Sequence, residues 1–363
     1  MKPKPHGQRT RPMRDVYDLR SDTAIQPTAA MVESLRGQYF ADDLLSEDAS
    51  TQQLLDHVCE AFGKEAALFT PTGTMSNQIA AAVVSRPGSE VVLGSDSHIY
   101  NLESGGLAAN SGVQVRAVGA DAGEYRVHEI EAALRTSALQ VAPTSAVFLE
   151  STYNLNAGHV SSLSNLQEIR EVVDRHGAFL YMDGARVFNA AEKLGVELSE
   201  IAQHVDALQF CLNKGLGGPL GSILVGTSEF VREAAMIRQR LGGGMRHTGF
   251  IAGPSLLAFE DWRERMAEDR AHAAVLASAL RSVESVTLMN DPIETNIVSF
   301  SLAASRSEAK HFEQQISQRG IHVKPIGPAA FRAVTHSSLS ADDVAFCAET
   351  MVKVLTAVAD SGR

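Results

Sequence analysis

The sequence is poor in cysteine, in net positive charge and in long apolar runs, and each shortage excludes a class of protein. Three cysteines (Cys59, Cys211 and Cys347) are far apart, odd in number and without metal-site spacing. They argue against a disulfide framework and fit a reducing compartment. A net charge of −11 disfavours nucleic acid or an anionic membrane as a partner. No apolar run approaches the roughly 18 residues of a membrane span. We therefore expect a soluble, cytoplasmic protein.

The chain is long enough, and apolar enough, to bury a large core. Its 363 residues are 44% hydrophobic and 21% charged, which is ordinary for a globular protein of up to two domains. Basic residues cluster at the start, but prolines interrupt them and no apolar stretch follows. Residues 1 to 14 therefore read as a disordered arm, since a secretory signal would need an apolar region.

Strands and helices alternate from about residue 60 to 226. Strands are expected at 67–69, 90–93, 113–118, 146–149, 178–182, 207–211 and 222–226, with helices at 51–62, 76–84, 128–135, 165–176 and 229–240. This alternation predicts an α/β fold with a mainly parallel, seven-stranded sheet covered on both faces. Beyond residue 260 the helices and strands are segregated, as in a smaller α+β domain. The expected division is an arm (1–14), an N-terminal segment that completes the active site and the small domain (15–45), a large domain (46–260) and a small domain (261–363).

A single lysine, Lys214, interrupts an apolar run, and four glycines follow it closely (Gly215, Gly217, Gly218 and Gly221). Glycine lets the backbone approach a ligand. A lysine beside a core strand is partly desolvated, which is the setting of a lysine that forms a Schiff base. A surface lysine in a glycine-rich turn fits the stretch equally well. The dinucleotide glycine motif does not fit, because its third position is Leu220.

Other polar groups stand at strand ends, where open α/β sheets bind ligands. They are His98, Asp183, Arg186 and the pair Gly73 and Thr74, which opens a helix. Taken singly, each has an ordinary reading as a loop histidine, a helix cap or a surface ion pair. With Lys214, they match what pyridoxal phosphate requires: an amine for the imine, an acid for the ring nitrogen and donors for the phosphate, together with a partner for the ring face and an arginine for the substrate carboxylate.

Seven motifs make the chain resemble the threonine aldolase family of fold-type-I pyridoxal-phosphate enzymes, from about Asp18 to His336. They are Asp-Leu-Arg-Ser-Asp-Thr (18–23), Phe-Gly-Lys-Glu-Ala-Ala-Leu-Phe (62–69), Thr-Gly-Thr-Met-Ser-Asn (72–77), Ser-His-Ile-Tyr (97–100), Asp-Gly-Ala-Arg (183–186), Asn-Lys-Gly-Leu-Gly (213–217) and Gly-Gly-Gly-Met-Arg (242–246). The resemblance implies a lyase that cleaves a β-hydroxy-α-amino acid, of the L-threonine or L-allo-threonine type, to glycine and an aldehyde.

The resemblance also assigns roles to single residues. Lys214 would bind the cofactor covalently, Asp183 would hold the ring nitrogen, and His98 would stack on the ring. His98 is also the candidate base, directly or through a water. The phosphate would be held by Gly73 and Thr74 and, from a neighbouring subunit, by Arg246. The substrate carboxylate would be bound by Ser21, Arg186 and Arg332. The shared phosphate site implies a homodimer or homotetramer, and no metal is expected.

Four positions depart from the family pattern: Leu45 and Leu102 where tyrosines are common, and Gln140 and Tyr153 where histidines are common. A less polar pocket would suit glycyl transfer, racemisation or β-elimination with the same lysine and aspartate, so these reactions remain alternatives. A non-catalytic scaffold that has kept the fold is a third hypothesis. The positions that would bind the cofactor are kept, whereas the departures lie on the side of the substrate side chain.

Overall fold

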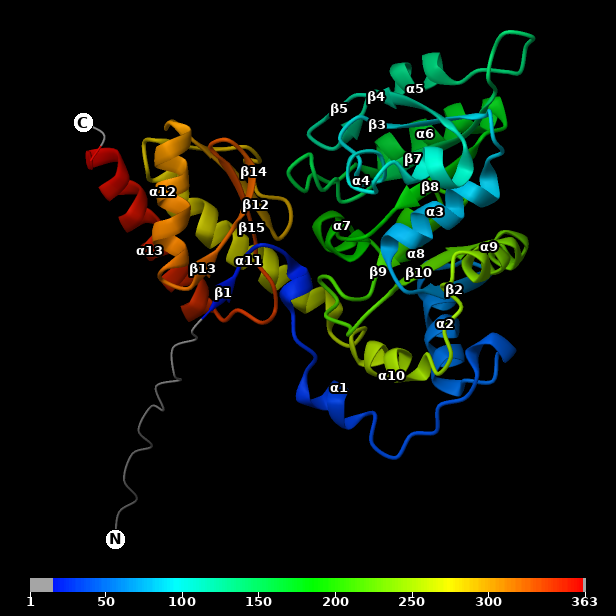
Figure 1. Ribbon diagram of the computed structural model, residues 1–363, viewed down its shortest axis with the longest axis horizontal. Coiled ribbons are helices and arrows are strands. Elements are labelled where there is room, and N and C mark those ends of the chain that lie inside the picture. The colour runs from blue at the N-terminus through cyan, green and yellow to red at the C-terminus, as the bar shows by residue number, and fades with distance from the viewer. Residues whose placement is uncertain (1–15, 362–363) are drawn as a thin grey trace.

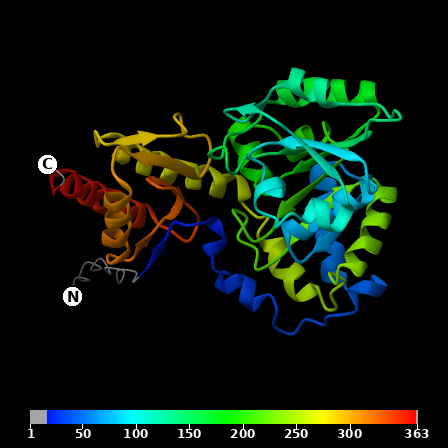
Figure 2. The same cartoon turned by 45° about the horizontal axis from the view of Figure 1, so that its top comes forward.

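The chain folds into two lobes joined by one long helix (Figures 1 and 2). The computed structural model describes residues 16–361, so the predicted arm at residues 1 to 14 lies outside them. The larger lobe is built on a seven-stranded sheet and the smaller lobe on a four-stranded one. Within the described part of the chain, no helix has the length and apolarity needed to span a bilayer.

The large sheet is mainly parallel, which confirms the predicted fold class. Its strands in spatial order are β2 (Ala66–Thr70), β10 (Ser222–Gly226), β9 (Ala207–Cys211), β8 (Phe179–Asp183), β7 (Thr144–Glu150), β3 (Glu90–Gly94) and β4 (Gln114–Val118). Strand β10 runs antiparallel to both of its neighbours. The carboxyl ends of β3, β7, β8 and β9 therefore share one edge, and strand pairing aligns Glu150, Asp183 and Gln209 in one row across it.

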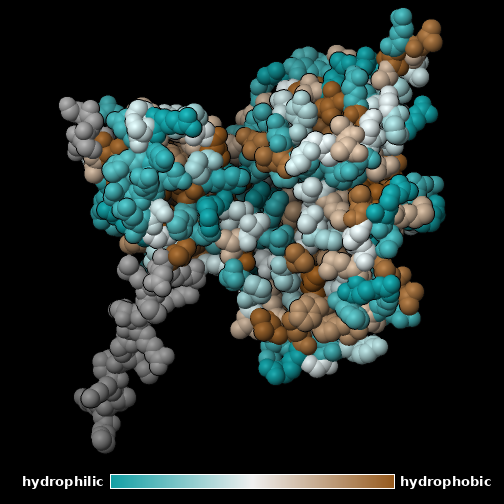
Figure 3. Space-filling model, viewed as in Figure 1, coloured by the Kyte–Doolittle hydropathy of each residue, from teal (hydrophilic) through white to brown (hydrophobic). Residues whose placement is uncertain are grey.

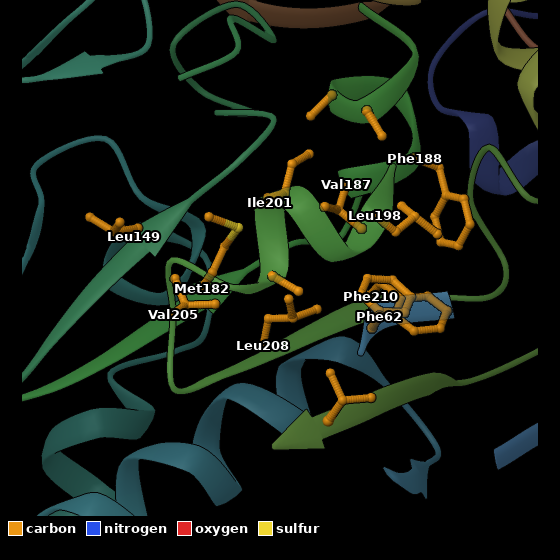
Figure 4. Close-up of a cluster of buried hydrophobic side chains, with 14 of the residues drawn as sticks. Phe62, Leu149, Met182, Val187, Phe188, Leu198, Ile201, Val205, Leu208 and Phe210 are labelled. Atoms are coloured by element: carbon orange, nitrogen blue, oxygen red, sulfur yellow. The ribbon is translucent and has the colours of Figure 1, made fainter. Parts of the chain in front are cut away.

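Helices cover both faces of this sheet, as its apolar strands require. One face is covered by α2 (Ala49–Phe62), α5 (Val127–Ala133), α6 (Leu163–His176), α7 (Val187–Leu194), α8 (Leu198–Ala202) and α10 (Gly249–Leu257). The other is covered by α3 (Gly73–Val84), the π-helix η3 (Leu107–Ser111) and α9 (Ser228–Arg240). Figure 4 shows the first core, where Phe62, Phe188 and Phe210 meet. Burying such a side chain contributes roughly 1.5–3 kcal/mol.

The small lobe packs helices on an antiparallel sheet. Its strands are β11 (Val286–Leu288), β12 (Ile297–Leu302), β15 (Ala330–Val334) and β14 (Lys324–Gly327), and its helices are α12 (Arg306–Ser317) and α13 (Ala341–Ser361). The long helix α11 (Trp262–Arg281) serves both lobes, because Met266 lies in the large core while Ala273 and Leu276 lie in the small one.

The N-terminal segment also connects the lobes. Strand β1 (Tyr17–Asp18) pairs with β13 (Ile321–His322) of the small lobe. The chain then passes through η1 (Asp22–Ala24), α1 (Ala29–Glu33) and η2 (Asp43–Leu45) to the base of the large lobe (Figure 1). Residues from this segment can therefore reach a site that lies between the lobes.

Several elements differ from the sequence prediction. Helix α3 begins at Gly73, three residues early, because the Thr72 hydroxyl caps it by accepting the Met75 N–H. Helices α7, α8 and α10, the short α4 (His98–Asn101) and the hairpin of β5 (Ala120–Asp121) and β6 (Glu124–Tyr125) were not expected. Helix α10 contains Gly253 and Pro254, so local propensity hides it and tertiary packing stabilises it.

Candidate active site

One pocket at the carboxyl edge of the large sheet gathers most of the residues singled out in the sequence. It is lined by Gly73, Thr74, His98, Asp183, Arg186 and Lys214. Thr23 from the N-terminal segment and Asn154 from the loop after β7 also line it. The residues that the structure places outside this lining are Ser21, Arg246 and Arg332. Residues at the ends of β3, β7, β8 and β9 therefore meet the amino end of α3 at a single cavity.

Asp183 ends β8, and its carboxylate is held by three N–H groups. Gln209 Nε2 and the Ala185 N–H donate to Oδ1 at 2.5 and 3.1 Å, and Asn77 Nδ2 donates to Oδ2 at 2.7 Å. The residue is only 5% exposed. These donors fix the carboxylate as an acceptor at the floor of the pocket. Sequence reasoning missed Asn77 and Gln209, although a polar residue inside a buried strand or helix is a usable signal.

The amino end of α3 points its free N–H groups into the pocket. Gly73 and Thr74 occupy the first turn, where N–H groups have no carbonyl partner within the helix. A Cβ at Gly73 would lie 2.9 Å from Cys211 Sγ and 3.2 Å from Gln209 Oε1, so the backbone approaches β9 in a way that only glycine allows. A helix end of this kind suits a phosphate group.

Lys214 lies in the tight turn between β9 and β10. The Gly217 N–H donates to the Lys214 carbonyl at 2.7 Å, and the Gly218 N–H donates to the Leu212 carbonyl at 2.8 Å. Gly217 and Gly221 have φ of +72° and +99°, a region that favours glycine. At these two positions the glycines serve the turn that presents Lys214, whereas the sequence suggested a close approach to a ligand.

His98 opens the short helix α4 just after β3. Its Nδ1 lies 2.9 Å from Glu103 Oε1, and its backbone N–H donates to Glu150 Oε2 at 2.6 Å. The hydrogen bond to Glu103 raises the pKa of His98, against the opposing effect of burial. Glu103 has no exposed side-chain surface, and no sequence signal pointed to it.

The two candidate arginines have different surroundings. Arg186 Nε and Nη2 both donate to the Asp22 carboxylate at 2.7 Å. Burial alone would raise the pKa of Asp22, but the Arg186 charge holds it well below its usual range. Arg332 has no carboxylate partner among its hydrogen bonds: Nη1 donates to Asn154 Oδ1 at 2.6 Å, Nη2 donates to the Arg20 carbonyl at 3.3 Å, and Nε is buried without a partner.

Burial, and then the nearby Arg186 charge, lower the pKa of Arg332 to about 10. A buried guanidinium without a carboxylate partner is stabilised when an anion, such as a substrate carboxylate, binds to it. Asn154 Oδ1 also lies 3.4 Å from Arg186 Nη1, so one amide links the arginine of the large lobe to that of the small lobe. The sequence prediction did not include Asp22 or Asn154 in the site.

Glu150 is a second buried acid of the pocket, and it was not predicted as a site residue. It ends β7 beside Asp183 in the strand pairing, and it accepts the N–H groups of His98 and Asn154. Burial, with the charge of Asp183 added, raises the pKa of Glu150 to about 7. An acid with such a pKa can hold or release a proton near neutral pH.

Ser21 and Arg246 lie apart from the pocket lining. Ser21 caps η1, where its Oγ accepts the Thr23 N–H at 3.3 Å. Arg246 pairs with Asp42 on the surface, and its side chain is 59% exposed. Arg246 therefore cannot contribute to the pocket of its own chain in this conformation.

The four positions that depart from the family pattern do not line the pocket formed by the described residues. Leu45 and Leu102 are 65% and 45% exposed. Gln140 lies in an exposed turn before β7, whereas the pocket lies at the other end of that strand. Tyr153 is fully buried, stacks on Tyr125 at 5.4 Å and accepts the Asp96 N–H. Within one chain, these residues therefore do not make the pocket apolar.

The residues present fit pyridoxal phosphate. Lys214 offers an amine, Asp183 an acceptor for a protonated ring nitrogen, and the Gly73 end of α3 a cradle that a Cβ would fill. A metal is a weaker match. Ligand atoms of His98, Glu103 and Asp183 lie within 4.8 Å of one another. The two carboxylates, however, already accept the hydrogens of the Asn77 amide, and those positively polarised hydrogens would repel a cation.

Comparisons with known proteins agree with this geometry. A model of the beta-eliminating lyase family matches residues 18–303. Low-specificity L-threonine aldolase 1 of Arabidopsis thaliana is 33% identical over 356 residues, which are 97% of this chain and 99% of that protein. The Escherichia coli K12 low specificity L-threonine aldolase is 33% identical over 331 residues, or 91% and 96% of the two chains. The solved threonine aldolase of Leishmania major has the same fold, with a TM-score of 0.80, 19% identity and coverage of 93% and 99%.

Proposed function

The chain belongs to the beta-eliminating lyase family and, within it, to the threonine aldolases, and from this premise we propose that it cleaves β-hydroxy-α-amino acids of the L-threonine or L-allo-threonine type to glycine and an aldehyde. The observation that carries the proposal is the single pocket in which Lys214, Asp183 and His98 meet the amino end of α3. These groups follow separate strands of the large sheet, and the fold brings them together at one edge.

When bound, pyridoxal phosphate supplies a conjugated ring that takes up the electron pair of the breaking Cα–Cβ bond. Lys214 would hold the cofactor covalently until the substrate amine replaces it. Asp183 would keep a proton on the ring nitrogen, and Gly73 and Thr74 would donate N–H groups to the phosphate. His98 would accept the proton of the β-hydroxyl group as the aldehyde leaves.

We assign the substrate carboxylate to Arg332 before Arg186, because two donors of Arg186 are already used on Asp22. We expect Arg332→Ala to lower kcat/KM about a hundredfold, mainly through KM, with little loss of stability. Arg186→Ala should instead destabilise the fold by about 3–5 kcal/mol, since it leaves the buried Asp22 charge unpaired. Steady-state kinetics and thermal unfolding of both variants check this difference. An unchanged KM for Arg332→Ala would contradict the assignment.

The direct test of function is aldehyde release by the purified, cofactor-loaded protein from L-threonine and L-allo-threonine. Acetaldehyde and glycine in equal amounts would support the proposal. Cofactor binding with glycine exchange, racemisation or β-elimination, but no aldehyde, would replace it with one of the related reactions. Cofactor binding with no turnover of any amino acid would leave only the scaffold hypothesis.

The proposed assembly is a homodimer or homotetramer in which Arg246 reaches the phosphate of a neighbouring subunit. The large lobe exposes Val32, Tyr39, Leu45, Met236 and Phe250, each at least 56% exposed. Figure 3 shows apolar residues gathered over its lower part, near α1 and α10. Large exposed apolar patches favour association. Sedimentation velocity should therefore give a dimer or larger, and a fully active monomer would refute the assembly.

The three unpaired thiols support a cytoplasmic location.

A further inference from the structure

A chain of buried hydrogen bonds connects the candidate base to the candidate ring acid. His98 Nδ1 lies 2.9 Å from Glu103 Oε1. Asn77 Nδ2 donates to that same oxygen and to Asp183 Oδ2, both at 2.7 Å, and Gln78 Nε2 donates to Glu103 Oε2 at 2.7 Å. Asn77, Gln78 and Glu103 are all less than 10% exposed. The network is therefore shielded from solvent, and the donor and acceptor groups within it show which atoms carry the hydrogens.

The surroundings of the two amides fix their orientation. The amide nitrogen of Asn77 faces two carboxylates, which only its two hydrogens can satisfy, while its oxygen accepts the Tyr181 hydroxyl at 2.9 Å. Gln78 is constrained in the same way, because its oxygen accepts Asn110 Nδ2 at 3.1 Å. Both oxygens of Glu103 thus receive amide hydrogens, so Glu103 serves as an acceptor on every side.

An acceptor next to His98 Nδ1 requires a hydrogen on that nitrogen. We propose that Glu103 is a positioning residue, which fixes the hydrogen of His98 on Nδ1 and leaves Nε2 as the basic nitrogen available to the substrate. This inference rests on the proposed function, because it deepens the part that His98 plays there. Gln78 supports the arrangement by holding the second oxygen of Glu103.

The carboxylate does more than orient the ring. Its negative charge stabilises the imidazolium that forms when His98 takes the β-hydroxyl proton, which strengthens the base. The raised pKa of His98 agrees with this effect. The charges of Asp183 and Glu150 also raise the pKa of His98, but the carboxylate that is hydrogen-bonded to its ring is that of Glu103. Glu103 is therefore the carboxylate whose removal should change the tautomer or the basicity of His98.

The first test reads the tautomer without any turnover. We would record magic-angle-spinning ¹⁵N spectra of the full-length, cofactor-loaded protein labelled at histidine, and assign His98 from its loss in His98→Asn. We expect a protonated Nδ1 and an unprotonated Nε2 at high pH. In Glu103→Gln the His98 titration should move down by about one pH unit, as expected on losing an adjacent opposite charge. A wild-type spectrum with the hydrogen on Nε2 would overturn the inference.

The second test uses the pH profile of kcat. His98 must be neutral to accept a proton, so activity is lost as the pH falls through its pKa. Because Glu103→Gln lowers that pKa, the acid limb should move to lower pH by about one unit. The rate on the plateau should fall about ten- to a hundredfold, because the base is weaker. KM should not change. Glu103→Asp keeps the charge and should restore part of both effects.

His159 and Glu294 provide a matched control, because they form the same kind of Nδ1 contact, at 3.3 Å, away from the pocket lining. Glu294→Gln removes this contact and should leave both the His98 titration and the pH profile of kcat unchanged. If Glu103→Gln lowers the rate without moving either the His98 titration or the acid limb, Glu103 is only structural and the inference fails. If the proposed function itself is wrong, the wild-type protein will release no aldehyde, which distinguishes that outcome from failure of this inference.

Discussion

Replacing Lys214 with alanine is expected to abolish covalent cofactor binding and to lower kcat by about 10⁴-fold or more, the scale seen when a nucleophile is removed. Lys214 lies in the β9–β10 turn and is the lysine that lines the pocket. Pyridoxal phosphate can still be held at the amino end of α3, so the cofactor should bind more weakly rather than not at all. The absorbance band of the bound cofactor near the visible edge, followed with aldehyde release, measures both effects.

Lys64 supplies the control for this substitution. Its amine is also partly buried, where it donates to the Val205 carbonyl at 2.6 Å, but it lies outside the pocket lining. Burial lowers the pKa of Lys64, so desolvation alone would make it resemble a cofactor lysine. Lys64→Ala should leave the absorbance band and the rate unchanged. A Lys214→Ala protein that keeps its band would mean that another amine holds the cofactor.

The sequence predicts the large sheet well because its strands are buried on both faces and read as continuous apolar runs. Strands β9 and β10 begin and end at the predicted residues. The helices that escaped prediction are short or carry residues that disfavour helix, such as Pro254 in α10. Such helices are stabilised by the sheet against which they pack, and no local pattern can reveal that contact.

The residues of the site likewise fall into a group that the sequence predicts and a group that it does not. Residues that follow strand ends, such as Asp183 and Lys214, are recognisable because strand topology sends them to one edge. Their partners are harder to recognise. Asp22 meets Arg186 only through tertiary folding, and Glu103, although only five residues from His98, reaches it through a turn after α4 that no repeating pattern marks. The sequence likewise could not show that Tyr153 turns away from the pocket toward Tyr125. Motifs thus supply the groups that react, whereas the fold supplies the groups that orient them.

Asp183→Asn should produce the second largest effect, a loss of about a thousandfold in kcat, because an amide cannot keep a proton on the ring nitrogen as a carboxylate does. The substitution keeps the size of the side chain, so the pocket should retain its shape. The substitution should also lower the stability of the fold, because three N–H donors hold the carboxylate in the wild-type protein. An amide at residue 183 has only one oxygen to accept them, and its nitrogen would face a donor. We expect a stability loss of about 1–3 kcal/mol as well.

Asp206→Asn separates these two effects. Asp206 precedes β9 at the opposite edge of the sheet, where it accepts the Leu180 N–H at 2.7 Å and Arg170 Nη1 at 3.0 Å. Its amide variant should lose stability because the ion pair with Arg170 is removed, while its kcat stays at the wild-type value. Thermal unfolding and kcat are therefore measured together for both variants. If Asp183→Asn loses stability but keeps its rate within about tenfold, Asp183 is only a structural acceptor. The ring nitrogen must then be held by another acid. Glu150 is the candidate, because it lies opposite Asp183 in the pairing of β7 with β8.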